Sequence, residues 1–220
     1  MTAYRIFLDT AELAEIRDAV STGLVDGIAT NPNKIAQSGK TYRQVLDEIR
    51  QCFAGPIAFQ AMGQTTDEII QHALEIHQMD PLLAVKVVAN RTGLPALRPL
   101  VAAGVRTNAT LMFNPTQALL AGLAGSPFIS PFIGRARMTG SDGIEAIRQM
   151  RQLYDAWGLT QTVIIGASIK DVTQVIDVIL AGAHSVAVPF AVFAAMMEHP
   201  LTAQGVQHFA AEFAKVRGRG

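Results

Sequence analysis

The stretch LLAVKVVAN, residues 82–90, decides the fold that the sequence predicts. It is a short apolar run, rich in valine and followed by an asparagine, which is typical of a strand buried on both faces. Strands of this kind belong to parallel sheets that helices cover on both sides. One charged residue, Lys86, interrupts the run, and its presence in a buried strand needs a chemical reason.

Seven further short apolar runs are spread over the rest of the chain, and six longer amphipathic segments separate or follow them. We expect Thr10 to be the N-cap of the first helix, because threonine is favoured there. The predicted strands are 4–9, 27–30, 56–62, 82–88, 105–112, 127–134, 162–168 and 185–190, and the predicted helices are 10–23, 41–53, 65–79, 141–157, 170–182 and 206–220.

This alternation predicts an α/β fold, a (β/α)8 TIM barrel with an additional C-terminal helix. The rival is an open doubly wound sheet, which usually carries a glycine-rich phosphate loop after its first strand. Here that strand ends in Asp9-Thr10 and no such loop follows. We expect residues 1–220 to form one barrel domain, in which 201–220 are a C-terminal helical extension.

The composition limits the partners of the protein. Eighteen basic and eighteen acidic residues give no net charge, so neither nucleic acid nor an anionic membrane is favoured. Half of the residues are hydrophobic, which indicates a homo-oligomer. One cysteine, Cys52, excludes a disulfide framework, and the five histidines lack metal-ligand spacing, so we expect no metal. Residues 1–10 lack a basic region followed by an apolar one, so we expect no signal peptide and a cytoplasmic location.

Polar residues collect where the predicted strands end, which is the face that carries the active site in this kind of barrel. A lysine between valines is poorly solvated, so its pKa falls, and a neutral amine can form a Schiff base with a carbonyl. Two alternatives stay open for Lys86: a side chain that reaches solvent, or an ion pair with Asp9. Asp9 itself can be a proton shuttle or a helix cap.

A second group of polar residues points to an anionic substrate. Ser168 and Lys170 lie where the seventh strand meets a helix, and Arg135 follows the sixth strand. A hydroxyl and a cation at such a place bind phosphate, and an arginine adds a bidentate contact. Ordinary helix capping and surface charge are the alternative.

Several motifs in register resemble the transaldolase family, especially its short members and the related fructose-6-phosphate aldolases. The resemblance runs over nearly the whole chain. It rests on FLDT (7–10), IATNPNKI (28–35), VKV (85–87), SPFIGR (130–135), GASIK (166–170) and VAVPF (186–190).

The resemblance implies a Schiff-base mechanism without any cofactor, in which a sugar-phosphate ketose donor and an aldehyde acceptor are the substrates. Lys86 matches the imine-forming lysine and Asp9 the acid/base. Thr110 and Gln60 match a pair that holds a catalytic water. The implied substrate contacts are Asn31 and Asn108 for donor hydroxyls, Ser130 for the dihydroxyacetone part, and Arg135, Ser168 and Lys170 for the acceptor phosphate.

Two of these residues, one in the substrate site and one in the catalytic pair, point to different reactions within the family. Phe132 resembles the transaldolases, whereas the aldolases have tyrosine there; this favours transfer of dihydroxyacetone to an acceptor. Gln60 resembles the aldolases, which release free dihydroxyacetone. The mixture also leaves open a modified substrate, such as a sulfo-sugar. A third hypothesis is a barrel that binds sugar phosphates without catalysis, and Lys86 and Asp9 argue against it. The family also suggests a pentamer or decamer, with the C-terminal helix packed on a neighbour.

Overall fold

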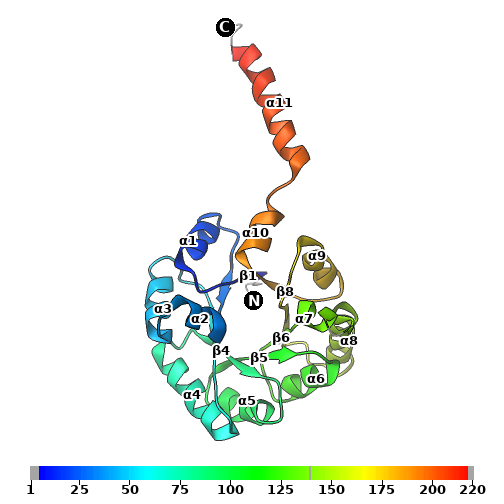
Figure 1. The fold of residues 1–220 in the computed structure, drawn as a ribbon. Helices are drawn as coiled ribbons and strands as arrows, with labels where there is room; N and C mark the ends of the chain where they lie inside the picture. The colour runs from blue at the N-terminus through cyan, green and yellow to red at the C-terminus, as the bar shows by residue number, and fades with distance from the viewer. Residues whose placement is uncertain (1–4, 139, 218–220) are drawn as a thin grey trace.

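The computed structural model describes residues 5–138 and 140–217, and these form a closed barrel of eight parallel strands surrounded by helices (Figure 1). The strands pair in sequence order, and β1 closes the ring against β8, with Ile6 opposite Val186. The prediction of a TIM barrel with an added C-terminal helix is therefore confirmed. The strands are β1 (Ile6–Asp9), β2 (Gly27–Ala29), β3 (Ile57–Gln60), β4 (Ala84–Val88), β5 (Arg106–Met112), β6 (Phe128–Pro131), β7 (Val163–Gly166) and β8 (Ser185–Val188).

The helices pack around the outside of the barrel, except for the last one, which stands away from it. Most apolar side chains pack between strands and helices in one continuous core. The helices are α1 (Leu13–Ser21), α2 (Pro32–Ser38), α3 (Tyr42–Arg50), α4 (Thr66–Met79), α5 (Gly93–Ala102), α6 (Pro115–Leu123), α7 (Ile133–Met138), α8 (Gly143–Ala156), α9 (Val172–Leu180), α10 (Phe190–Met196) and α11 (Pro200–Arg217).

Local capping explains where several helices begin. Thr41 and Thr65 each form a capping box at the start of α3 and α4, where the hydroxyl accepts from the backbone of the third helical residue. The expectation for Thr10 is wrong, because α1 begins at Leu13 after the N-cap residue Glu12. Thr10 instead forms a short turn: its hydroxyl accepts from the Glu12 amide and donates to the Glu15 carboxylate.

Small and aromatic side chains share the inside of the barrel. Phe7, Ala29, Ile165, Ala167 and Ala187 form a separate cluster there. TIM-barrel interiors are usually filled with bulky branched residues. The three alanines in this cluster leave room in the middle of the ring, and this room opens toward the ends of the strands.

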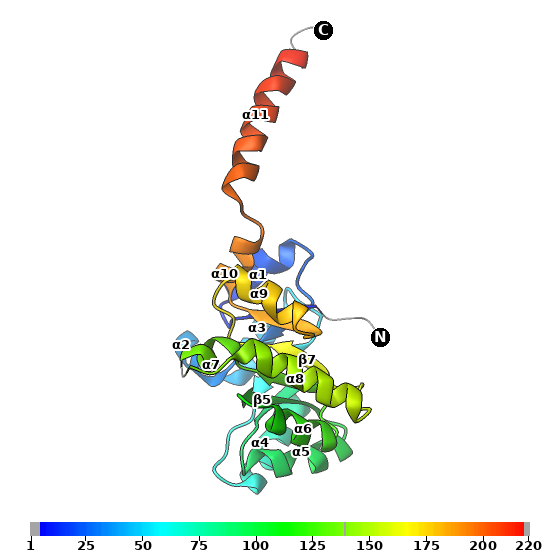
Figure 2. The ribbon, with the colours of Figure 1, turned by 90° about the vertical axis from the view of Figure 1, so that its right-hand side faces the viewer.

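The C-terminal helix α11 stands away from the barrel in both views (Figures 1 and 2). None of its described residues is buried. The helix begins at Pro200, six residues before the predicted segment 206–220, and residues 218–220 lie outside the described part of the chain. A helix of 18 residues without a partner presents its apolar side chains to solvent.

Candidate active site

A cavity of about 330 Å³ occupies the middle of the barrel and opens between α2 and α7. These two helices lie on opposite sides of the ring in Figure 1 and at the same end of it in Figure 2. Nine of the eleven predicted site residues line this cavity, and Gln60 and Thr110 do not. The nine are Asp9, Asn31, Lys86, Asn108, Ser130, Phe132, Arg135, Ser168 and Lys170.

Lys86 lies at the centre of β4 with only 6% of its surface exposed. Its strand neighbours Val85 and Val87 are buried on the opposite face, so the amine faces the cavity. Nζ donates one hydrogen bond, to the carbonyl oxygen of Thr30 at 2.9 Å. Burial lowers the pKa of Lys86, and the charges of Asp9 and Lys34 act on it in opposite directions. The alternative that the Lys86 side chain reaches solvent is therefore wrong.

Asp9 ends β1 and faces the same cavity. Its carboxylate oxygen Oδ2 lies 4.0 Å from Nζ of Lys34 on α2. Within the described residues, the ion pair with Asp9 is therefore formed by Lys34 and not by Lys86. Asp9 lies outside α1 and is not its N-cap residue, which leaves the carboxylate free to exchange protons with a bound molecule.

Asn108 and Ser130 form the wall of the cavity next to Lys86. In the strand register Lys86 lies opposite Asn108, and Thr110 lies opposite Ser130. The Ser130 hydroxyl donates to Oδ1 of Asn108 at 2.9 Å, and both side chains are buried. This bond fixes the orientation of the Asn108 amide, so that its NH2 group remains a donor for a substrate hydroxyl.

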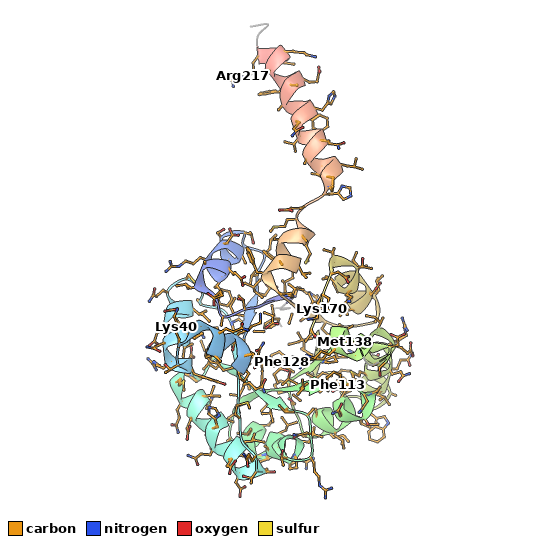
Figure 3. All side chains as sticks on the ribbon, viewed as in Figure 1. Lys40, Phe113, Phe128, Met138, Lys170 and Arg217 are labelled. Carbon is orange, nitrogen blue, oxygen red and sulfur yellow. The ribbon has the colours of Figure 1, made fainter. Side chains whose placement is uncertain are left out.

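The cationic part of the site lies where β6 and β7 end. Arg135 is on α7, and its guanidinium carbon lies 5.4 Å from the centre of the Phe132 ring. Ser168 has φ of 60°, a left-handed conformation that is rare for serine and bends the loop after β7. Its carbonyl accepts from the amide of Gly134 at 3.1 Å. Lys170 follows at the exposed rim of the barrel (Figure 3).

Gln60 and Thr110 lie beside the cavity rather than on its wall. Gln60 pairs with Lys86 in the register of β3 and β4, and its amide is 3.6 Å from Sδ of Met62. Thr110 is 1% exposed, and its hydroxyl has no hydrogen-bond partner among the residues that the structure describes. Leu111 follows with φ of 57°, at a shift of register between β5 and β6. The two side chains are therefore not brought into the lining as the sequence suggested.

Several lining residues were not among the predicted site residues. α2 contributes Asn33, Lys34 and Gln37 to one side of the mouth, and β5 contributes Arg106 at its first position. The motif 28–35 contains Lys34, but sequence spacing gives no sign that this lysine lies beside Asp9. That neighbourhood exists only because the strands β1 and β2 run parallel and place their ends together.

The site has the features of a place for carbonyl chemistry on a small anionic molecule. Within residues 5–138 and 140–217, no three histidine, cysteine or acidic side chains lie close enough together to hold a metal ion. No helix in that part of the chain is long and apolar enough to cross a membrane. The buried amine, one carboxylate and several cations are what the cavity offers for chemistry.

Comparisons with known proteins agree with this geometry. Residues 6–218 match the family described as Transaldolase/Fructose-6-phosphate aldolase. A probable transaldolase of Symbiobacterium thermophilum is 38% identical over 98% of this chain and 99% of its own length. Probable transaldolases of Caulobacter sp. (strain K31) and Clostridium perfringens (strain SM101) are 40% and 37% identical, each over 96% of this chain and 96% and 98% of their own lengths.

A solved structure also shares the fold. The thiamine phosphate pyrophosphorylase from Pyrococcus furiosus superposes with a TM-score of 0.56, at 16% identity, over 85% of this chain and 86% of its own. At that identity the likeness concerns the barrel alone.

Proposed function

The chain belongs to the transaldolase/fructose-6-phosphate aldolase family, and on that premise we propose that it is a transaldolase, which moves a dihydroxyacetone unit from a ketose phosphate to an aldose phosphate. One observation carries the proposal: an amine with 6% exposure faces a cavity that also holds a carboxylate and an exposed cationic rim. Donors of the fructose 6-phosphate or sedoheptulose 7-phosphate type fit this description.

The mechanism starts from the neutral amine of Lys86. Burial lowers the pKa of Lys86, which favours the free amine that attacks C2 of the ketose. Loss of water gives an imine, and Asp9 takes the proton of the O4 hydroxyl while the C3–C4 bond breaks. The electron pair of that bond moves into the protonated imine, which becomes an enamine, and the aldose leaves.

The second half of the reaction reverses these steps with another aldehyde. The enamine carbon attacks the acceptor carbonyl, Asp9 returns the proton to the new hydroxyl, and water hydrolyses the imine to free Lys86. We assign Asn31, Asn108 and Ser130 to the donor hydroxyls. Arg135, Ser168 and Lys170 are proposed to bind the phosphate, which the exposed rim leaves accessible.

A lyase that releases free dihydroxyacetone is the second candidate, and Gln60 is the observation that favours it. Against it, Phe132 lines the cavity with a ring that carries no hydroxyl for proton transfer to the enamine. An assay with fructose 6-phosphate as donor, run with and without erythrose 4-phosphate as acceptor, separates the two reactions. Product that forms only with the acceptor means transfer, and free dihydroxyacetone without acceptor means cleavage.

Borohydride trapping tests the proposed nucleophile directly. With fructose 6-phosphate we expect a stable mass adduct on the peptide that contains Lys86, and loss of both adduct and turnover in Lys86→Ala. Circular dichroism of this variant should match the unsubstituted protein, because β4 keeps its backbone pairing with β3 and β5 without the lysine side chain. Absence of an adduct with fructose 6-phosphate, sedoheptulose 7-phosphate and sulfofructose would leave only a binding barrel.

We also propose that copies of the chain assemble through α11. Val206, Phe209, Phe213 and Val216 recur at helical spacing and are each more than 60% exposed. The family resemblance suggests pentamers, alone or stacked as decamers. Light scattering should report an oligomer for the unsubstituted protein and smaller species for the double variant Phe209→Asp, Phe213→Asp.

A cytoplasmic location stays a prediction.

A further inference from the structure

Lys34 gives the catalytic cavity a second lysine close to Asp9. Its Nζ lies 4.0 Å from Oδ2 of Asp9, and the two side chains are 28% and 25% exposed. Lys34 sits in the third position of α2, where its backbone amide donates to Oδ1 of the N-cap residue Asn31 at 3.2 Å. The short helix thus holds the lysine at the mouth of the cavity, above the first strand.

We propose that Lys34 is a positioning residue for the Schiff-base step: from 4.0 Å it offsets the charge of the Asp9 carboxylate, so that Asp9 holds the Lys86 amine less firmly in its protonated form. The inference rests on the proposed function, since it concerns the same amine, but it makes a separate claim about a residue on α2. No direct contact between Lys34 and the substrate is required.

The physical reasoning concerns three charges around one cavity. A carboxylate close to an amine favours the ammonium, and a cation disfavours it. Burial is the largest influence that lowers the pKa of Lys86; Asp9 raises this pKa, and Lys34 lowers it. Without Lys34, no cation beside Asp9 would offset the effect by which the Asp9 carboxylate raises the pKa of Lys86.

The other charged groups around the cavity do not replace Lys34. Asp9 is the one acidic residue among the described lining residues. Arg135 and Lys170 are both exposed at the opposite side of the mouth, where solvent screens their charge. Arg106 belongs to the first position of β5, two residues before the position paired with Lys86. Only Lys34 forms an ion pair with Asp9 within the described residues.

The test compares Lys34→Met with Lys40→Met. Lys40 pairs with Glu48 at 2.7 Å on the outer side of the barrel (Figure 3), outside the cavity lining, so its variant removes the same charge at a distance from the site. In Lys34→Met we expect the acid limb of kcat/KM against pH to move up by about 0.5 to 1 unit, a three- to tenfold loss on that limb. Lys34→Arg should restore the profile, and Lys40→Met should leave it unchanged.

A second readout separates this inference from the proposed function. Formaldehyde condenses with a free amine, water leaves, and cyanoborohydride reduces the imine to methyl-lysine; mass spectrometry of the Lys86 peptide then gives the rate at each pH. We expect the trapping profile to move up in Lys34→Met by the same amount. An unchanged trapping profile overturns the role of Lys34 even in an active transaldolase. A shifted profile in a protein without transaldolase activity supports Lys34 and removes the function instead.

Discussion

Two threonines on β5 provide a stability comparison that depends on one hydrogen bond. Thr107 and Thr110 are both buried, at 0% and 1% exposure. The Thr107 hydroxyl lies 2.9 Å from the hydroxyl of Ser126, whereas the Thr110 hydroxyl has no partner among the described residues. Valine has the same shape as threonine and suits a strand, so the substitution of each residue measures its hydroxyl alone.

The magnitudes follow from the two environments. A hydrogen bond between neutral groups contributes about 1 kcal/mol net, and loss of one partner of a buried pair costs about 1–3 kcal/mol. Thr107→Val should therefore lower the free energy of unfolding by about 1–2 kcal/mol. Thr110→Val removes a buried hydroxyl that no protein group satisfies, so this free energy should stay unchanged or rise by up to about 1 kcal/mol.

Urea unfolding followed by circular dichroism measures both variants, at one protein concentration because assembly couples to stability. Kinetics give the other half of the comparison: Thr110→Val should lose at least about tenfold in kcat, or 1.4 kcal/mol, if its hydroxyl holds the catalytic water, and Thr107→Val should stay within about twofold. If Thr110→Val lowers the free energy of unfolding by more than about 1 kcal/mol, the Thr110 hydroxyl has a partner and the assignment is refuted. Full activity in that variant would refute its part in catalysis.

Three further outcomes are expected. Gly134→Ala places a methyl group 2.3 Å from the Ser168 carbonyl oxygen and should displace α7 with Arg135, raising KM for the sugar phosphate about tenfold, or 1.4 kcal/mol; Gly205→Ala, in open space, should leave KM unchanged. Tyr154→Phe removes a fully buried hydroxyl that donates to the Ala118 carbonyl at 2.7 Å, and urea unfolding should show a loss of about 1–3 kcal/mol. Burial and the neighbouring arginines lower the pKa of His184, so the unfolded chain binds more protons and stability should fall as pH drops below about 6.5; His184→Gln should flatten that fall in urea unfolding measured between about pH 7.5 and 5.5.

The sequence predicted the strands well because buried parallel strands carry an unambiguous apolar signal. Each described strand lies inside a predicted run. Within the run 127–134 the strand β6 ends at Pro131, and α7 begins two residues later, at Ile133. The helices were harder to identify. α5 contains Pro99 in its interior, which removes a helical donor, and α2 and α7 are only seven and six residues long. Their sequences lack the long amphipathic pattern that identifies α4 or α8.

The candidate site could be assembled from the sequence only as far as strand ends could be located. Asp9 and Ser130 follow from that rule, because the barrel brings strand ends to one face. Lys86 was recognised differently, as the one charged residue in the buried run 82–90. The pairing of Lys34 with Asp9 could not be predicted, since it depends on how α2 turns after β2. Thr110 was assigned to the site by family resemblance, and it is absent from the cavity lining although it pairs with the lining residue Ser130.

The closure of β1 against β8 has a consequence for synthesis of the chain. The strand β1 is synthesised before the rest of the sheet, yet its partner on that side follows some 180 residues later, because Ile6 pairs with Val186. Until then the growing sheet has two open edges, and unpaired edges attract other strands. A nascent chain of this protein should therefore need protection by chaperones until β8 leaves the ribosome.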